Sequence, residues 1–202
     1  MFYTDYGIVV LAAGNSSRLG FPKQLLEING ESFLHRITSE MIKTGFPVVA
    51  VLGHQYNRME REVASGVNVF CNIDWSKGIG NSIKAGVRSL FDKASGLKAV
   101  VVMPCDQPYI TAELIGELIA GHRAGHKLVA SAYNHEYGTP ILIDHSMFKE
   151  INRLANNDDL NLILQMHSVY GVPFPLGGYD IDTEEQWKDL FSMERAKLGP
   201  KH

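Results

Sequence analysis

Residues 8–26 read IVVLAAGNSSRLGFPKQLL, and this stretch decides the fold that we expect. Its first part, Ile8–Ala13, is a short apolar run typical of a strand that is buried on both faces of a parallel sheet. The run ends in a loop that contains Gly14, two serines, Arg18 and Lys23. Open α/β sheets bind ligands at loops that follow the carboxyl ends of their strands. The stretch therefore predicts an α/β domain with a binding loop directly after its first long strand.

The rest of the chain alternates between short apolar runs and segments with apolar residues at helical spacing. This alternation predicts a three-layer α/β sandwich with a mostly parallel, Rossmann-like sheet. The expected strands are Val48–Gly53, Val67–Cys71, Ala99–Met103 and Leu128–Ala132, with Thr139–Ile143 and Val169–Phe174 as further candidates. The expected helices are Phe33–Lys43, Tyr56–Ala64, Asn81–Phe91, Ala112–Ala120, Met147–Leu154 and Leu160–Met166. Thr183 and Gln186 form a capping-box pattern that predicts one more helix start near the end of the chain.

Composition bounds the class of protein. The 202 residues contain no repeat and no linker-like segment, so we expect a single domain over residues 1–202. The formal net charge is -3, with no polybasic stretch, which argues against a nucleic-acid partner. No apolar run approaches the roughly 20 residues that span a bilayer. The two cysteines form no CxxC pair, and the first apolar run lacks a basic leader, so we expect a cytoplasmic protein.

The loop after the first strand has the chemistry of a phosphate site. Gly14 permits close approach of the backbone, so that amides can point at phosphate oxygens. Arg18 offers a planar fork of donors, and Lys23 offers a mobile point charge. A Walker A spacing fails, because Phe21 and Pro22 separate Gly20 from Lys23, and GxGxxG is absent. A surface turn with solvated charges is the alternative.

A single carboxylate marks the end of a second buried strand. Ala99–Met103 continues into PCDQP, which places Asp106 at the binding edge of the expected sheet. Carboxylates suit Mg²⁺, which takes oxygen ligands and bridges to substrate phosphates. The alternative is that Asp106 belongs to an Asp-x-Pro turn before the helix expected after Thr111.

The two segments together resemble a known family. LAAGNSSRLGFPKQLL is similar to the signature LAAGxSxRxGxPKxLL of the molybdenum cofactor cytidylyltransferases and related nucleotidyltransferases, and PCDQP resembles their second signature. The resemblance implies a fold of the nucleotide-diphospho-sugar transferase type. It implies that Arg18 and Lys23 contact the triphosphate and that Asp106 holds the catalytic Mg²⁺. The nucleotide-binding residues that it implies are Leu11, Ala12, Ala13, Gly14, Ser16, Ser17, Lys23, Gly78, Ser82 and Pro104.

The same resemblance implies a reaction. A protein of this family would move CMP from CTP onto the phosphate of molybdopterin or a similar acceptor and release pyrophosphate. Ala13 stands where the guanylyltransferase branch typically carries glycine, which favours the cytidylyl branch. The N-terminal half would hold the nucleotide and the C-terminal half the acceptor. A molybdoenzyme or its maturation chaperone would be the protein partner.

Three weaker segments complete the comparison. Asn72–Ile83 resembles the family's segment beside the nucleotide, with Ser82 as a contact, although Ser82 could instead cap the helix. Asp158 or Asp159 falls where the family often carries a GDxGAR stretch that serves a second metal, but the glycine and arginine are missing here. Asp180-Ile181-Asp182-Thr183 matches the family's DIDT motif, but capping of the last helix by Asp182 and Thr183 is the favoured explanation.

Other functions remain open at this stage. A sister enzyme would use the same loop on a sugar or polyol phosphate. A glycosyltransferase would need a DxD metal motif at a strand end, and the only match, Asp180–Asp182, lies late in the chain. A non-catalytic nucleotide-binding or cofactor-chaperone module is the third alternative, and the altered stretch at Asp158 and Asp159 keeps it open.

Overall fold

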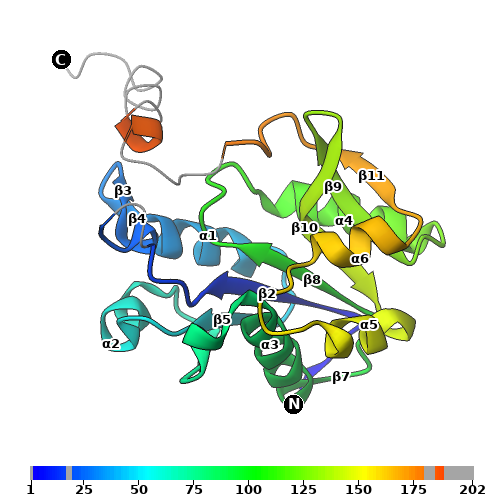
Figure 1. The fold of residues 1–202 in the computed structure, drawn as a ribbon, viewed down its shortest axis with the longest axis horizontal. Helices are drawn as coiled ribbons and strands as arrows, with labels where there is room; N and C mark the ends of the chain where they lie inside the picture. The colour runs from blue at the N-terminus through cyan, green and yellow to red at the C-terminus, as the bar shows by residue number, and fades with distance from the viewer. Residues whose placement is uncertain (1, 17–19, 180–184, 189–202) are drawn as a thin grey trace.

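A computed structural model describes residues 2–16, 20–179 and 185–188 of the chain, arranged as one sheet between two layers of helices (Figure 1). The structure thus confirms the three-layer α/β fold. Four residues with sequence-based assignments lie outside the described residues: Ser17, Arg18, Asp180 and Asp182. Thr183, the expected helix cap, is also outside them, and residues 185–188 behind it are helical.

The central sheet has seven strands in the order β11-β9-β10-β8-β2-β5-β6. Their bounds are β2 (Tyr6–Ala12), β5 (Val48–Leu52), β6 (Asn68–Cys71), β8 (Ala99–Pro104), β9 (Leu128–Tyr133), β10 (Glu136–Asp144) and β11 (Tyr170–Pro173). β10 runs antiparallel to β8 and β9, and every other neighbouring pair is parallel. The mostly parallel sheet is therefore confirmed, and each expected strand is present with ends that differ by a few residues.

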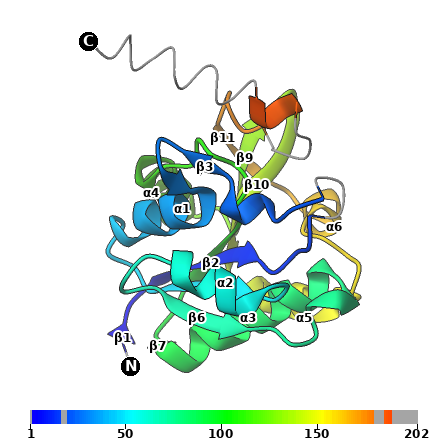
Figure 2. The ribbon, with the colours of Figure 1, turned by 90° about the vertical axis from the view of Figure 1, so that its left-hand side faces the viewer.

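Helices cover both faces of the sheet (Figure 2). α1 (Phe33–Ile42) and α4 (Ala112–Arg123) pack on one face, and α3 (Ile79–Lys93), α5 (Phe148–Arg153) and α6 (Asn161–Met166) on the other. The expected helix over residues 56–64 is wrong in part. It consists of the one-turn α2 (Tyr56–Met59) and a 3₁₀ turn at Glu60–Glu62, after which Val63 is extended.

Alternating residues of the central strands build the two halves of the core. In β2, Ile8 and Val10 face the α1 and α4 side, whereas Val9 faces α3. All three side chains are fully buried, as expected for a strand covered on both faces. Gly86 lets α3 approach closely, because a Cβ at this position would lie 2.5 Å from Val9 Cγ1.

Two short strand pairs were not expected from the sequence, although Asn29-Gly30, at positive φ between β3 and β4, is a dipeptide typical of a hairpin turn. β1 (Phe2–Tyr3) pairs with β7 (Ala94–Ser95), and β3 (Glu27–Ile28) pairs with β4 (Glu31–Ser32). Two-residue strands are too short for an alternating pattern, so the sequence analysis missed all four.

The strand order creates a crevice between β2 and β8. From β2 the chain builds β5 and β6 on one side, and it then returns to place β8 on the other side of β2. Such a switch point is where open α/β sheets bind ligands. Because β10 is antiparallel, its first residues, including Glu136 and Tyr137, lie at the same edge as the carboxyl ends of the parallel strands.

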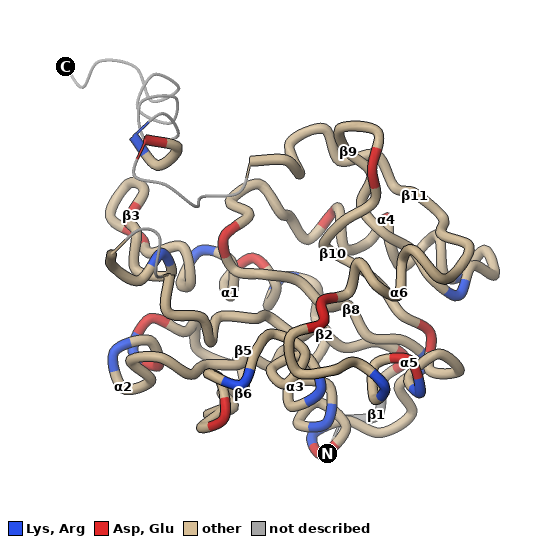
Figure 3. Tube along the Cα trace, in the orientation of Figure 1, with Lys and Arg blue, Asp and Glu red and all other residues tan. Residues whose placement is uncertain are grey.

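Charged residues of both signs are distributed along the trace rather than gathered on one face (Figure 3). The described residues include no helix with the length and apolar character needed to cross a bilayer.

Candidate active site

A cavity of about 520 Å³ opens at the carboxyl ends of β2 and β8. Its walls come from the loop that follows β2 (residues 13–23, called the first-strand loop below), from the start of α3 and from the end of β8. The lining residues are Leu11, Ala12, Ala13, Gly14, Asn15, Lys23, Gln24, Trp75, Ser76, Gly78, Ile79, Ser82, Pro104, Cys105 and Asp106. Nine of these were expected from the sequence to bind a nucleotide or metal: Leu11, Ala12, Ala13, Gly14, Lys23, Gly78, Ser82, Pro104 and Asp106. The structure thus brings together segments that lie far apart in the chain. We call this space the nucleotide cavity below.

Lys23 and Asp106 meet across the nucleotide cavity. The Lys23 ammonium forms an ion pair with Asp106 Oδ2, and the two side chains are 21% and 11% exposed. Lys23 begins a 3₁₀ turn, Lys23–Leu25, that follows Pro22, and Asp106 follows β8. The two charged groups expected to act on the triphosphate and the metal are therefore paired with each other.

The thiol beside Asp106 is not a reactive group. Cys105 is buried, and burial together with the neighbouring Asp106 charge raises the pKa of its thiol to about 12. A thiol with such a pKa stays protonated and is a poor nucleophile.

Hydrogen bonds of the Ser16 and Gln24 side chains connect the start of the first-strand loop with its end at Lys23. Ser16, with a φ of 51°, accepts a hydrogen bond from the Lys23 backbone N–H at 3.0 Å. Gln24 is 1% exposed, and its amide donates to the carbonyls of Ala12 at 3.1 Å and Gly14 at 2.8 Å. The sequence analysis missed Gln24, because nothing in the pattern PKQLL shows that this polar side chain points inward.

The start of α3 forms another wall of the nucleotide cavity. Gly78 and Gly80 allow this turn to lie against residues 155–158, because a Cβ on either glycine would come within 2.3 Å of a backbone oxygen there. Ser82 is buried and accepts a hydrogen bond from Asn72 Nδ2 at 3.0 Å. The alternative that Ser82 caps the helix is wrong, since α3 begins at Ile79 and Ser82 lies in its first turn.

Two ring-bearing residues lie near this wall. His54 packs edge-on against Trp75, with ring centroids 5.3 Å apart, and does not line the nucleotide cavity. Trp75 belongs to the Asn72–Ile83 segment expected beside the nucleotide, and it packs against the core and also lines the nucleotide cavity.

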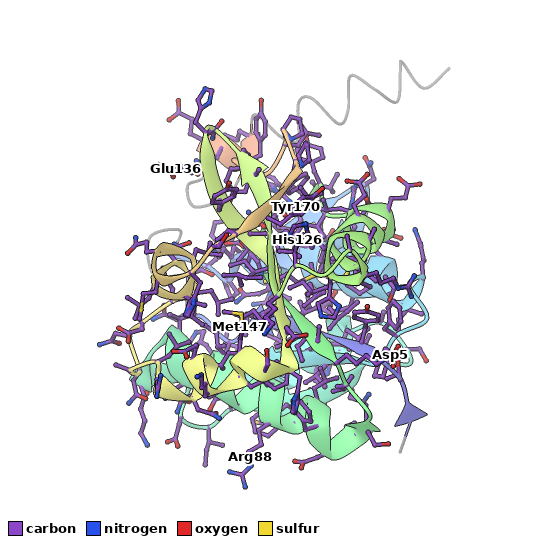
Figure 4. The ribbon with its side chains drawn as sticks, turned by 90° about the vertical axis from the view of Figure 1, so that its right-hand side faces the viewer. Asp5, Arg88, His126, Glu136, Met147 and Tyr170 are labelled. Atoms are coloured by element: carbon purple, nitrogen blue, oxygen red, sulfur yellow. The ribbon has the colours of Figure 1, made fainter. Side chains whose placement is uncertain are left out.

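A second cavity of about 630 Å³ adjoins the first, and we call it the acceptor-side cavity. Leu11, Ile79 and Pro104 line both cavities. The remaining lining residues come mainly from later in the chain: Ile83, Tyr133, Glu136, Tyr137, Gly138, Thr139, Asp159, Leu160, Asn161, Leu164 and Gln165. Figure 4 shows Glu136 near the tip of the β9–β10 hairpin, whereas Arg88 projects from α3 at the opposite end of the molecule.

The structure separates the two candidates for a second metal ligand. Asp159 lines the acceptor-side cavity and accepts a hydrogen bond from the Asn161 N–H at 2.9 Å. Asp158 lines neither cavity, and its carboxylate accepts from the Ala155 N–H at 2.7 Å. Of the two, only Asp159 faces a cavity that adjoins the one containing Asp106.

Asp106 is the one carboxylate among the described residues that line the nucleotide cavity. Within residues 2–16, 20–179 and 185–188, no three His, Cys, Asp or Glu side chains gather closely enough to hold a metal ion by themselves. This donor set fits Mg²⁺, which proteins commonly bind through one or two carboxylates while substrate phosphates complete the shell.

Comparison with known proteins agrees with the geometry. The model of the MobA-like NTP transferase domain matches residues 8–170. This range includes the sheet except the first two residues of β2 and most of β11, and it includes every described residue that lines either cavity. The chain belongs to the MobA-like NTP transferase family. The resemblance inferred from the two signature segments is thereby confirmed at the level of the family.

Relatives within and around this family have diverse names. The chain is 31% identical over 193 residues to nicotine blue oxidoreductase of Paenarthrobacter nicotinovorans, a match that covers 88% of this chain and 92% of that protein. It is 27% identical to a probable molybdenum cofactor guanylyltransferase of Bacillus cereus strain AH187, covering 91% and 90% of the two chains. A homologue of Mycobacterium tuberculosis Rv0371c from Mycobacterium sp. strain JC1 has a similar structure, with a TM-score of 0.79 and 25% identity over 95% of this chain and 98% of that chain.

Proposed function

We propose that this MobA-like NTP transferase moves a nucleoside monophosphate from an NTP onto a phosphorylated acceptor and releases pyrophosphate. The observation that carries the proposal is the meeting of Lys23 and Asp106 in one cavity with the first-strand loop. CTP is the proposed nucleotide, and a molybdopterin-type compound is the proposed acceptor. Membership of the family supports the nucleotidyl transfer, and the roles of individual residues are proposed from their charge and their positions in the two cavities.

The proposed roles in binding follow from charge and position. The first-strand loop and Lys23 hold the triphosphate, with Arg18 and Ser17 assigned to it from the signature motif. Asp106 holds Mg²⁺, which would neutralise charge on the bound phosphates. Lys23 exchanges its contact with Asp106 for the phosphates, since phosphate oxygens carry more negative charge than one carboxylate.

The chemistry needs positioning rather than a covalent enzyme intermediate. An oxygen of the acceptor phosphate attacks the α-phosphorus of the NTP, and a new P–O bond forms to it. The bond from the α-phosphorus to the bridging oxygen of the β-phosphate breaks, and its electron pair leaves with pyrophosphate. Lys23 stabilises charge that develops on the transferred and leaving groups. The acceptor-side cavity adjoins the nucleotide cavity, which allows the two substrates to meet.

The proposed division of the chain follows the two sets of lining residues. Among the described residues, those that line the nucleotide cavity are all numbered 11–106, whereas the acceptor-side cavity adds residues 133–165. This supports placing the nucleotide on the N-terminal half and the acceptor on the C-terminal half. Asp159 is the proposed ligand if a second metal takes part, because it faces the acceptor-side cavity.

Cytosine is the proposed base because Ala13 replaces the glycine typical of the guanylyltransferase branch. Ala13 is buried at the end of β2 and lines the nucleotide cavity. The guanylyltransferase name of the B. cereus relative favours GTP instead. If Ala13 sets the base, Ala13→Gly should shift the ratio of kcat/KM for CTP to that for GTP toward GTP, and an unchanged ratio would remove Ala13 from the argument.

The decisive experiment measures nucleotide binding and pyrophosphate release. Thermal stabilisation by CTP, GTP, ATP and UTP with Mg²⁺ is compared for the wild type, Lys23→Ala and Asp106→Ala. A ligand at about a hundred times its Kd should add roughly 2.7 kcal/mol of stability. Pyrophosphate release is then assayed with molybdopterin and with sugar and polyol phosphates. Lys77→Ala is the control, because Lys77 pairs with Asp74 and lines neither cavity.

Each outcome separates the candidates. Binding and pyrophosphate release that both depend on Lys23 and Asp106 support the transferase, and the productive acceptor decides between molybdopterin and a sugar or polyol phosphate. Stabilisation without release by any acceptor supports the non-catalytic module. Stabilisation by no nucleotide contradicts the proposal.

A second candidate function rests on one specific observation. The relative that is 31% identical over most of both chains is named an oxidoreductase. The discriminating assay mixes the protein with nicotine blue and a reduced nicotinamide dinucleotide and follows the absorbance of both. Turnover there, without pyrophosphate release from any NTP, would favour the oxidoreductase over the transferase.

A further inference from the structure

We propose that Gln24 is a positioning residue of the nucleotide site: its buried amide sets the direction of the loop peptides that face the phosphates and of Lys23. This inference rests on the proposed function, because it assigns a task to the same loop. Gln24 is 1% exposed and lies directly after Lys23. Its side chain points away from solvent and under the loop, where it meets three different groups.

The Gln24 side chain makes three hydrogen bonds to the loop. Its Nε2 carries two N–H donors, and both are used, toward the carbonyls of Ala12 at 3.1 Å and Gly14 at 2.8 Å. Its Oε1 accepts from Ser16 Oγ at 3.3 Å. A single side chain therefore fixes three points of the first-strand loop.

These contacts determine where the loop amides point. In a planar trans peptide the carbonyl of one residue and the N–H of the next point in opposite directions. With the carbonyls of Ala12 and Gly14 held by Gln24, the N–H groups of Ala13 and Asn15 are turned away from it. Ala13 and Asn15 both line the nucleotide cavity. Backbone N–H groups aimed at a cavity in this way can donate hydrogen bonds to phosphate oxygens.

A second chain of contacts runs from Gln24 to Lys23. Ser16 donates to Gln24 Oε1 and accepts from the Lys23 backbone N–H at 3.0 Å. Ser16 holds a φ of 51°, which is uncommon for a residue other than glycine. The hydroxyl of Ser16 thus closes the loop and fixes the point from which the Lys23 side chain reaches Asp106.

Glutamine is the residue that this environment requires. Glutamate has the same length but offers no donor when ionised, and it would bring a negative charge against two carbonyl oxygens. Methionine has a similar length without hydrogen-bonding groups, so it would fill the space and leave the carbonyls and Ser16 unpaired. Comparing the two variants separates the loss of donors from the added charge.

The experiment uses the full chain with Gln24→Met, Gln24→Glu and the control Thr38→Val. Thr38 is also fully buried and hydrogen-bonded, but it joins α1 to Ala64 and lines neither cavity. The first readout is amide hydrogen exchange without ligand. We expect exchange of the Lys23 N–H, which is protected by its hydrogen bond to Ser16, to become at least about tenfold faster in both Gln24 variants, whereas Thr38→Val leaves it unchanged.

The second readout is the pyrophosphate-release assay. We expect kcat/KM for the NTP to fall at least about tenfold in Gln24→Met, with most of the loss in KM, because a loop that is no longer pre-ordered binds the phosphates less well. Thr38→Val, compared at a temperature equally far below its own Tm, should keep the wild-type value. If both Gln24 variants keep wild-type exchange of the Lys23 N–H, the proposal is overturned. Equal losses of kcat/KM in Gln24→Met and Thr38→Val would also overturn it.

The two readouts keep the inference separate from the function on which it rests. Hydrogen exchange needs no nucleotide, so it tests the loop-ordering role even if the wild type releases no pyrophosphate. In that case the proposed function fails, while the exchange data still confirm or refute the control of the loop by Gln24.

Discussion

Replacing Lys23 with methionine should raise the affinity of the nucleotide-free protein for a divalent cation. Lys23 and Asp106 form an ion pair, so a metal ion must displace the ammonium to reach the carboxylate. With an NTP present, the phosphates attract Lys23 away and bring their own oxygens to the metal. Metal and nucleotide should therefore bind cooperatively in the wild type, and the coupling should be lost in Lys23→Met.

The size of the effect follows from the burial of the pair. At an effective dielectric constant of about 20, unit charges roughly 4 Å apart attract by about 4 kcal/mol, and desolvation offsets part of this. With side chains 21% and 11% exposed, the pair lies between exposed pairs, worth up to about 1 kcal/mol, and buried pairs, which cost roughly 3–5 kcal/mol to break. We expect a net value of about 1–2 kcal/mol, which corresponds to a roughly 5- to 30-fold gain in metal affinity.

Isothermal titration with Mg²⁺ or Mn²⁺ measures the affinity of each protein for the metal, first without and then with a nucleotide. Lys77→Met is the matched control, because it breaks the exposed pair with Asp74 and touches neither cavity. Asp106→Asn should abolish the site in either background. The reasoning is refuted if Lys23→Met binds the metal alone no better than the wild type, or if Lys77→Met gains as much.

Three further predictions concern stability and reactivity. Gly86→Ala should lower the free energy of unfolding by about 1–2 kcal/mol in urea titrations, because its Cβ would lie 2.5 and 2.6 Å from two valine side chains and overpacking outweighs the gain in helix propensity; an unchanged midpoint would contradict this. Burial raises the pKa of Asp144, but hydrogen bonds from a nearby serine and from His122 outweigh it and hold that pKa below its ordinary value. The stabilisation by the Asp144 carboxylate is thus complete above the unfolded-state pKa of about 3.9 and is lost as pH falls through the lower folded-state pKa. Asp144→Asn should therefore lower the free energy of unfolding at about pH 7, and the two proteins should have similar free energies of unfolding near pH 2. A difference in free energy that stays constant with pH would refute this. A thiol reagent should modify the exposed Cys71 within minutes in the native protein and reach the buried Cys105, with its pKa of about 12, only on unfolding; equal rates would contradict the buried environment.

The strands of the sheet could be predicted from the sequence because a buried strand has a continuous apolar signature. Val48–Leu52 is buried at every residue, as its composition indicates. The direction of a strand leaves no such trace: β10 is as apolar in its second half as the adjacent strands β8 and β9, and only its pairing with them shows that it is antiparallel. The short helix at Tyr56–Met59 was overestimated because helical spacing continues past the point where Val63 becomes extended.

The candidate site was predictable where a motif fixes both residue type and spacing. Lys23 and Asp106, which are 83 positions apart, meet as their signature segments indicate. Contacts that depend on side-chain direction were not predictable. Gln24 is polar and follows a lysine, so its sequence position alone suggests solvent, and only the fold shows that it turns inward. The choice between Asp158 and Asp159 was open by one residue, and the turn at this loop decides which of them faces a cavity.

The position of the site follows from the strand order more than from any single residue. Leu11 and Pro104, at the adjacent ends of β2 and β8, line both cavities. The first-strand loop therefore enters from one side of the crevice, and the β9–β10 hairpin enters from the other because β10 runs antiparallel. A parallel strand in place of β10 would put residues 136–139 at the opposite edge of the sheet and remove a wall of the acceptor-side cavity. The single antiparallel strand is thus the feature that lets one sheet present two adjoining sites.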